Sequence, residues 1–241
     1  QLRDATFMGY PRPDGRVGTR NEIWIINTVG CVNRTAERLA ADANRCFAGR
    51  TDGIFTFVHP HGCSQLGADH EATRRILLDL VQHPNAGGVL VLGLGCENNT
   101  VPAFKEALGE YDPDRVKFLV AQEVNDEIDV GLALLEELVV AGERATRISC
   151  PVCKLVVGLK CGGSDGLSGI TANPLVGCFS DRLVGAGGTA VLTEVPEMFG
   201  AETILMNRCR DADVFQKTVE LIGNFKAYFV RHGQAVYENP S

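Results

Sequence analysis

The chain has 241 residues, of which 45% are hydrophobic and 22% charged, and its formal net charge is −7. This balance is ordinary for a globular protein, and the negative charge argues against a nucleic-acid or anionic-membrane surface, which needs clustered lysine and arginine. No apolar run approaches the roughly 20 residues of a membrane span, and no charged-then-apolar signal segment opens the chain. We therefore expect a cytoplasmic protein.

Residues 1–20 are polar and rich in glycine, proline and arginine, which predicts an extended arm. From residue 21 onward, continuous apolar runs alternate with segments of helical periodicity. The predicted strands are 23–26, 54–58, 89–92 and 116–121, and the predicted helices are 34–46, 69–82, 101–108 and 126–142. Such alternation is typical of a parallel sheet covered on both faces. We therefore expect residues 21–146 to form a doubly wound, mostly parallel, three-layer α/β domain of the Rossmann or flavodoxin type.

A second α/β unit is predicted for residues 147–241. Its predicted strands are 155–159 and 189–193, and its predicted helices are 174–184, 199–206 and 213–232. Because no closing strand follows the last helix, we expect this unit to be the beginning of a larger domain.

Four of the nine cysteines directly follow predicted strands, namely Cys31, Cys63, Cys96 and Cys161. The carboxyl ends of parallel strands share one edge of a sheet, where ligands bind. We therefore expect the first three thiols to converge and Cys161 to face them across a domain cleft. Thiolates favour soft metals such as iron, iron–sulfur clusters or zinc. A mononuclear iron(II) site with histidine and oxygen ligands is the competing interpretation.

The remaining cysteines are interpreted as structural. Cys150 and Cys153 form one CxxC pair without a second, so they do not match a zinc ribbon. Cys46, Cys178 and Cys209 fall within predicted helices and are expected in the core, because a free cysteine usually behaves as a small apolar residue.

Two histidines, His59 and His61, stand beside Cys63 and are the best acid–base candidates, since histidine titrates near neutrality. Loop histidines that only bind the backbone are the alternative. Asn98 and Asn99 follow Cys96 and are candidate polyol contacts, although they could also cap the next helix.

The segment after strand 155–159 is rich in glycine and hydroxyl groups, and glycine lets backbone N–H groups approach an anion closely. We expect substrate contacts from Gly162, Gly163, Ser164 and Ser168, and a catalytic role for Asp165. A dinucleotide site is disfavoured, because the run 93–95 lacks the third glycine in register.

Several motifs in the chain resemble the altronate dehydratase/galactarate dehydratase family. They are GYPRPDGRVGTRN (9–21), TVGCVN (28–33), GCSQLG (62–67), GLGCENN (93–99) and above all CGGSDGLSGITANP (161–174). The segments TEVPEMFGAE (193–202) and YENPS (237–241) are closer to the altronate-acting branch of the family.

The resemblance implies an enzyme that eliminates water from a sugar acid, converting D-altronate to 2-dehydro-3-deoxy-D-gluconate in hexuronate catabolism. It implies Fe2+ as the cofactor, with Mn2+ or an iron–sulfur cluster as alternatives. It also implies a longer protein with an N-terminal domain of the SAF type and a further C-terminal portion, which would be this chain's partners, with homo-oligomers possible. This chain would then be a central piece and could be inactive alone.

Lys160 departs from the family pattern, in which an acidic residue usually precedes the CGGSD run. The alternatives to an altronate dehydratase are a galactarate dehydratase, a sulfo-lyase acting on sulfolactate, and a non-catalytic scaffold piece of such an enzyme.

Overall fold

The computed structural model describes residues 4–160 and 165–237, which fall into two compact units. Residues Thr6–Cys150 form the first, called here the α/β/α unit. The second, called the C-terminal unit, consists of residues 4–5 and the described residues from Pro151 onward.

A four-stranded parallel sheet forms the centre of the α/β/α unit. Its strands are β3 (Glu22–Asn27), β4 (Ile54–Thr56), β5 (Ala86–Gly93) and β6 (Val116–Val120), in the spatial order β4-β3-β5-β6. Ile25 lies opposite Thr56 on one side and Leu90 on the other, so the two central strands are paired along their length. The doubly wound, flavodoxin-like prediction is confirmed.

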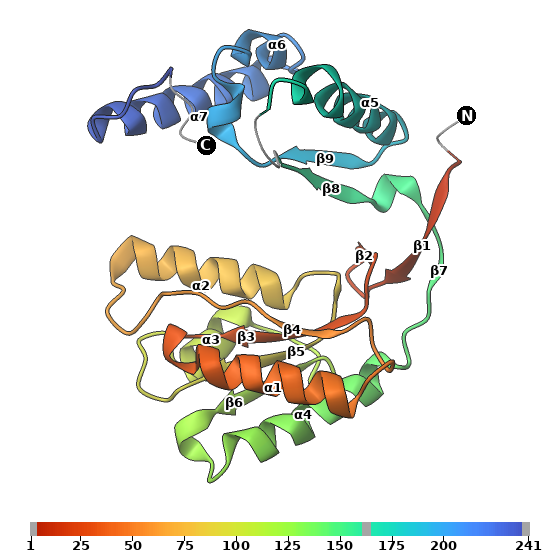
Figure 1. Ribbon diagram of the computed structural model, residues 1–241, viewed down its shortest axis with the longest axis vertical. Coiled ribbons are helices and arrows are strands. Elements are labelled where there is room, and N and C mark those ends of the chain that lie inside the picture. The colour runs from red at the N-terminus through yellow and green to blue at the C-terminus, as the bar shows by residue number, and fades with distance from the viewer. Residues whose placement is uncertain (1–3, 161–164, 238–241) are drawn as a thin grey trace. The chain divides into compact units, whose positions relative to one another are not determined.

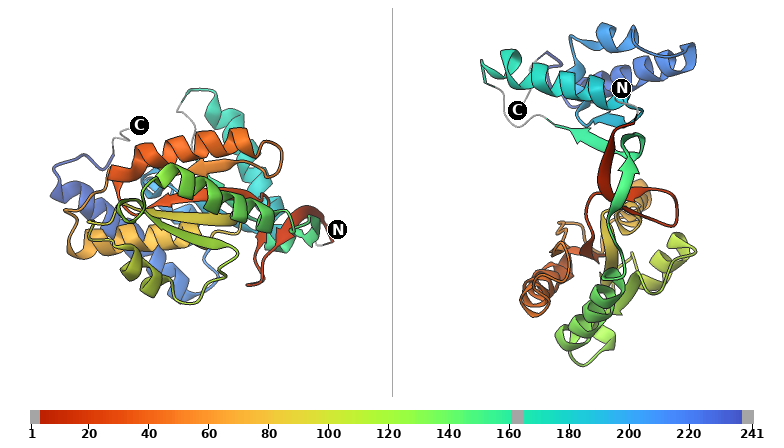
Figure 2. Two further views of the ribbon diagram at one scale, coloured as in Figure 1. Left: turned by 90° about the horizontal axis from the view of Figure 1, so that it is seen from below. Right: turned by 90° about the vertical axis from the view of Figure 1, so that its right-hand side faces the viewer.

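Helices cover both faces of this sheet (Figures 1 and 2). Because side chains alternate along a strand, Ile23 and Ile25 pack with α1 (Asn33–Cys46) and α4 (Glu127–Gly142). Trp24 and Ile26 pack on the other face, with α2 (Gly67–Val81) and α3 (Val101–Leu108). Both clusters consist of buried side chains, which explains why the strand segments are apolar on both sides.

The predicted arm is hydrogen-bonded to residues that precede β3 and β5, at the amino ends of these strands. Its residues form β1 (Thr6–Pro11) and β2 (Val17–Gly18), which pair with β7 (Ile148–Pro151) in the order β2-β1-β7. The Arg12 guanidinium donates to the Pro84 carbonyl at 2.7 Å and to the Asn21 side chain at 3.1 Å. Burial of this guanidinium lowers the pKa of Arg12 to about 10.

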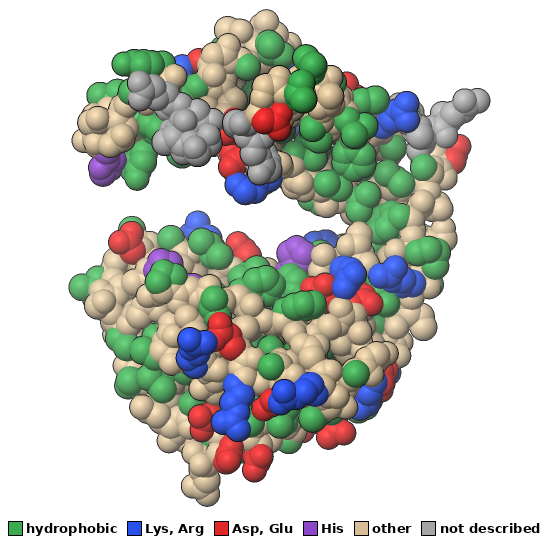
Figure 3. All heavy atoms as spheres, viewed as in Figure 1, with side chains coloured by type: hydrophobic (Ala, Val, Ile, Leu, Met, Phe, Trp, Pro, Cys, Tyr) green, Lys and Arg blue, Asp and Glu red, His purple; other side chains and the backbone are tan. Residues whose placement is uncertain are grey.

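The C-terminal unit is built around two parallel strands, β8 (Val156–Leu159) and β9 (Thr189–Leu192). Its helices, α5 (Ala172–Gly185), α6 (Glu202–Met206) and α7 (Ala212–Arg231), lie on one side of these strands (Figures 1 and 2). Many of its apolar side chains are exposed (Figure 3). Short 3-10 segments cover Gly30–Val32, Ala121–Glu123, Val152–Lys154, Ser168–Ile170 and Val195–Met198.

The structural cysteines correct part of the sequence analysis. Cys150 is buried, but Cys46 and Cys178 are exposed and Cys209 is only half-buried, so the prediction of three core residues is wrong. Cys46 and Cys178 were placed by their position in predicted helices, which does not say which face of the helix is covered. Cys209 lies between α6 and α7, outside both the predicted and the observed helices. Within the described residues, no helix is long and apolar enough to cross a membrane.

Candidate active site at the strand ends

The candidate site lies where the winding of the sheet reverses. The chain leaves β3 through α1 on one face of the sheet and leaves β5 through α3 on the other, although β3 and β5 are neighbours. The loops after these two strands therefore diverge at the carboxyl ends of the strands, the position at which open α/β sheets bind ligands.

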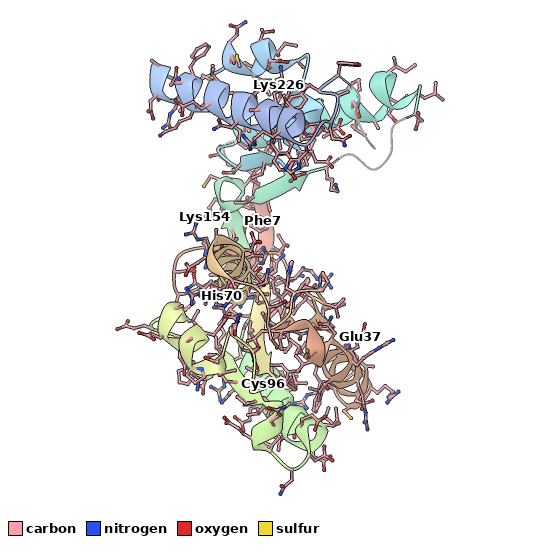
Figure 4. All side chains as sticks on the ribbon, turned by 90° about the vertical axis from the view of Figure 1, so that its left-hand side faces the viewer. Phe7, Glu37, His70, Cys96, Lys154 and Lys226 are labelled. Carbon is pink, nitrogen blue, oxygen red and sulfur yellow. The ribbon has the colours of Figure 1, made fainter. Side chains whose placement is uncertain are left out.

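Three of the four predicted thiols lie in loops at this end of the sheet. Cys31 lies in the 3-10 turn after β3, Cys63 in the loop after β4, and Cys96 in the loop after β5, where Figure 4 labels it. Loss of solvation is the largest cause that raises the pKa of Cys96, and the nearby thiol of Cys63 is the second largest. Glu97, Cys31 and a hydrogen bond with Cys63 raise it further. All three thiols are exposed. Cys161, the fourth, lies outside the described residues.

The loops after β3 and β4 are in direct backbone contact. The amide of Gly30 donates to the carbonyl of His61 at 2.6 Å. A Cβ at Gly30 would lie 2.7 Å from the carbonyl oxygen of His59, so only glycine permits this approach. Asn33 adds a hydrogen bond from its amide to the same His59 carbonyl at 2.9 Å. These contacts hold the Cys31 turn against the segment that carries the two histidines.

Hydrogen bonds fix the orientation of the two histidine rings, whose centroids are 5.5 Å apart. Nε2 of His59 lies 2.9 Å from the carbonyl oxygen of Asn27, which can only accept, so this nitrogen carries the proton. Nδ1 of His61 lies 3.2 Å from the side-chain amide of Gln65, which is also 2.9 Å from the Thr73 hydroxyl on α2. His61 is exposed, whereas Nδ1 of His59 is buried and has no hydrogen-bond partner among the described residues.

The loop after β5 is organised by a buried carboxylate. Glu97 is 3% exposed and accepts hydrogen bonds from the Thr28 hydroxyl at 2.6 Å and from the amides of Leu94 and Gly95 at 3.1 and 2.6 Å. Burial alone would raise the pKa of Glu97, but these hydrogen bonds hold it below its ordinary value. Glu97 therefore faces its own loop and the end of β3.

The two asparagines that follow are placed differently from each other. Asn98 is exposed and donates to the carbonyl of Gln65 at 3.2 Å, which links the loops after β5 and β4. Asn99 is 5% exposed and directs its amide toward the carbonyl of Thr28 at 3.5 Å. Of the two predicted polyol contacts, only Asn98 is accessible to a ligand.

The remaining predicted site residues belong to the C-terminal unit. Asp165 accepts hydrogen bonds from the amides of Leu167 and Ser168 at 2.7 and 2.9 Å, and these bonds, with that of Leu167 first, lower the pKa of Asp165. Lys160 pairs with Glu194 at 2.6 Å. Gly162, Gly163 and Ser164 lie outside the described residues.

The donors in these loops suit iron or an iron–sulfur cluster better than manganese. Three thiols supply soft ligands, whereas Mn2+ prefers oxygen, and the carboxylate of Glu97, which acts on Cys96, is already occupied by hydrogen bonds from Thr28 and the loop. The unpartnered Nδ1 of His59 is a further nitrogen donor in this region. Among the described residues, however, no three such side chains are arranged as a metal-binding group.

Sequence reasoning missed the residues that orient the others. Asn27 and Thr73 lie outside the motifs named above, and Gln65 lies inside the GCSQLG motif, but nothing in the sequence indicates that these side chains contact the histidines or one another. Thr28 could have been found, because it is a polar residue placed directly after a buried strand beside the first thiol.

Comparison with known proteins matches this architecture to one family. Residues 9–142 match the model of the D-galactarate dehydratase/altronate hydrolase second domain, and residues 152–241 match that of the D-galactarate/altronate dehydratase C-terminal domain. The chain belongs to the galactarate dehydratase/altronate hydrolase family.

Relatives in this family match nearly the whole chain. It is 55% identical to altronate dehydratase of Bacillus subtilis and 53% identical to altronate dehydratase of Escherichia coli, over 99% and 100% of its length. It is 31% identical over 96% of its length to the (2R)-sulfolactate sulfo-lyase subunit beta of Chromohalobacter salexigens. The chain spans 48% and 49% of the two altronate dehydratases, about half their length.

Proposed function

We propose that the protein to which these residues belong is a hydro-lyase that eliminates water from a sugar acid, with D-altronate as substrate and 2-dehydro-3-deoxy-D-gluconate as product. The meeting of Cys31, Cys63 and Cys96 at the switch point carries the proposal. The choice of altronate rests on relatives of that name at 53–55% identity, against 31% for the sulfolactate sulfo-lyase subunit. We place the enzyme in the cytoplasm, where thiols stay reduced.

The reaction requires help at two atoms of the substrate. The proton on the carbon beside the carboxylate is weakly acidic, and the hydroxyl on the next carbon is a poor leaving group. We propose iron, as Fe2+ or in an iron–sulfur cluster, held by Cys31, Cys63 and Cys96 with Cys161 as a fourth ligand. Iron there would act as a Lewis acid on a substrate oxygen and stabilise the charge that develops on it. Mn2+ remains the alternative.

His61 and His59 are the proposed proton-transfer groups. The ring of His61 is exposed beside Cys63, and its Nδ1 is held by Gln65, so Nε2 is the nitrogen presented to a substrate. The Thr73 hydroxyl can donate as well as accept a hydrogen bond. Gln65 can therefore turn either its NH2 group or its carbonyl oxygen toward Nδ1 of His61. His61 can therefore take the proton from carbon as a base or return one to the departing hydroxyl as an acid.

The C-terminal unit is proposed to supply substrate contacts. Gly162, Gly163, Ser164 and Ser168 would bind the carboxylate or hydroxyl groups together with Asn98, and Asp165 would assist proton transfer. Asp165 already receives two backbone hydrogen bonds, which favours its ionised form.

A sulfo-lyase acting on sulfolactate is the second candidate, favoured by the relative of that name, which covers 96% of the chain. Both reactions remove a group from the carbon next to the one that loses a proton, so the same residues could serve either. A non-catalytic scaffold role is the third.

The test is a comparison of Cys63→Ala with Cys46→Ala in the full-length enzyme, purified without oxygen. Cys46 is also an exposed thiol but lies at the end of α1, outside the site. We expect Cys63→Ala to lose bound iron and to lower turnover of altronate by at least about 100-fold, the upper range for disturbing a metal's surroundings. We expect Cys46→Ala to keep both. Full iron content and unchanged turnover in Cys63→Ala would remove the thiol assignment, and faster turnover of sulfolactate than of altronate would favour the second candidate.

A further inference from the structure

The carboxylate of Glu97 is buried inside the loop that follows β5. It is 3% exposed, and in the described part of the chain it forms no ion pair with lysine or arginine. An unpaired buried charge is unfavourable unless hydrogen bonds compensate for the lost water. The structure supplies three such bonds, all from the two loops that flank the switch point.

Only an acceptor suits this position. One donor is the Thr28 hydroxyl after β3, and the other two are the consecutive amides of Leu94 and Gly95 after β5. A carboxylate has two oxygens and no hydrogen, so it can accept all three. A glutamine of the same shape would turn an N–H group toward at least one of these donors. A Cβ at Gly93 would lie 2.7 Å from Oε1 of Glu97, so glycine leaves room for the carboxylate there.

This hydrogen bonding fixes the backbone on both sides of Cys96. The residue before it, Gly95, donates its amide hydrogen to the carboxylate of the residue after it, Glu97. Gly95 has a φ of 128°, a conformation that side chains rarely adopt, which allows the backbone to turn there. The turn leaves Cys96 exposed and in hydrogen-bond contact with Cys63, while Glu97 points inward.

We propose that Glu97 is a positioning residue: its buried carboxylate, held by Thr28 and the amides of Leu94 and Gly95, places the thiol of Cys96 beside that of Cys63, so that the two thiols bind a thiophilic metal ion together. The identity of the native metal group rests on the proposed function. The placement of the thiols does not, and it can be measured separately. The carboxylate also adds negative charge beside the thiols, which a bound cation would offset.

The first experiment uses Cd2+ as the probe, because it binds thiolates and gives an ultraviolet charge-transfer band. The variants are Glu97→Gln, Thr28→Val and, as the matched control, Glu22→Gln. Glu22 begins β3 at the opposite edge of the sheet, where it accepts a hydrogen bond from the Trp24 indole at 2.8 Å and pairs with Arg20 at 3.0 Å. Thermal unfolding of each variant is measured alongside.

We expect Glu97→Gln to weaken Cd2+ binding by about 10- to 100-fold, the range for residues that orient metal ligands. Thr28→Val should act in the same direction but less strongly, since it removes one of three hydrogen bonds. Glu22→Gln should bind Cd2+ as the original chain does. Equal Cd2+ affinity in folded Glu97→Gln and in the original chain would overturn the proposal, and if Glu97→Gln does not fold, Thr28→Val decides it.

A second experiment separates this proposal from the proposed function. Metal-free protein is treated with dibromobimane, which links two neighbouring thiols, and the linked peptide containing Cys63 and Cys96 is quantified by mass spectrometry. We expect the link to form several-fold more slowly in Glu97→Gln than in Glu22→Gln. Equal rates would overturn the role of Glu97 whatever the native metal is. A slower rate together with weaker Cd2+ binding would uphold it even if the full-length enzyme contains no iron, which would contradict the proposed function alone.

Discussion

In the α/β/α unit, helices lie against both faces of the sheet, whereas in the C-terminal unit all the helices lie on one side of two strands. The first unit buries two clusters of aliphatic and aromatic side chains. In the described part of the second, the buried apolar side chains are Leu183, Ala186 and Ile222. The three thiols proposed to bind the metal lie in the unit whose sheet is covered by helices on both faces. Precise placement of catalytic groups depends on such rigid support.

The largest expected effect contrasts one leucine from each unit. Leu135 on α4 is fully buried, and Leu175 on α5 is 71% exposed. We expect Leu135→Ala to lower the free energy of unfolding by about 2 to 5 kcal/mol, because it leaves a cavity in a packed core. Leu175→Ala should change it by less than about 0.5 kcal/mol. Urea denaturation measures both, and similar losses for the two would contradict the contrast between the units.

The second prediction concerns the contact between the loops that follow β3 and β4. We expect Gly30→Ala to destabilise the chain by about 1 to 3 kcal/mol, since its Cβ would clash with the carbonyl of His59. It should also weaken binding of Cd2+ by separating Cys31 from Cys63. Gly62→Ala is the control, because a Cβ there meets nothing within 4 Å. Unfolding and Cd2+ titration of both variants test this, and a harmless Gly30→Ala would show that the two loops can move apart.

The smallest expected effect is a dependence on pH that arises in the α/β/α unit. The ring of His83 stacks on Trp24 with centroids 5.0 Å apart, and its Nδ1 accepts a hydrogen bond from the amide of Asn85 at 3.1 Å. Burial, followed by the charge of Arg16, lowers the pKa of His83 below its ordinary value of 6.5. The unfolded chain therefore binds this proton more readily than the folded one.

The stabilising contribution of neutral His83 is complete above about pH 6.5 and is lost as the pH falls from there through the lower, folded-state pKa. Unfolding free energies measured on both sides of this window should fall with acidification, and less so in His83→Gln, which keeps an acceptor but does not titrate. An equal decline in His83→Gln would assign the effect to other groups.

The sequence was sufficient to predict the sheet and to place one cysteine in each of three loops at its carboxyl end. Runs such as Ile23–Ile26 and Val89–Leu92 are apolar without interruption, which is typical of strands covered on both faces, and each is followed by a loop with one thiol.

The sequence did not reveal that Glu97 turns inward, because the hydrogen bond that it accepts from Thr28 joins residues 69 positions apart in the chain. Nor did helical position reveal the exposure of Cys46 and Cys178, because what covers a helix is decided by distant segments. β7 was also missed, because it is short and mostly exposed.

The pairing of β3 with β5 also has a consequence for how the protein acquires its site during synthesis. The amide of Thr28 bonds to the carbonyl of Leu92, and Cys96 follows only a few residues later. Until β5 has left the ribosome and docked on β3, the third thiol has no fixed position beside the other two. Contacts between residues so far apart in the chain form late and slowly in folding. A metal ion or cluster that needs all three thiols must therefore be loaded after this part of the sheet has formed, as a step that completes the fold rather than one that starts it.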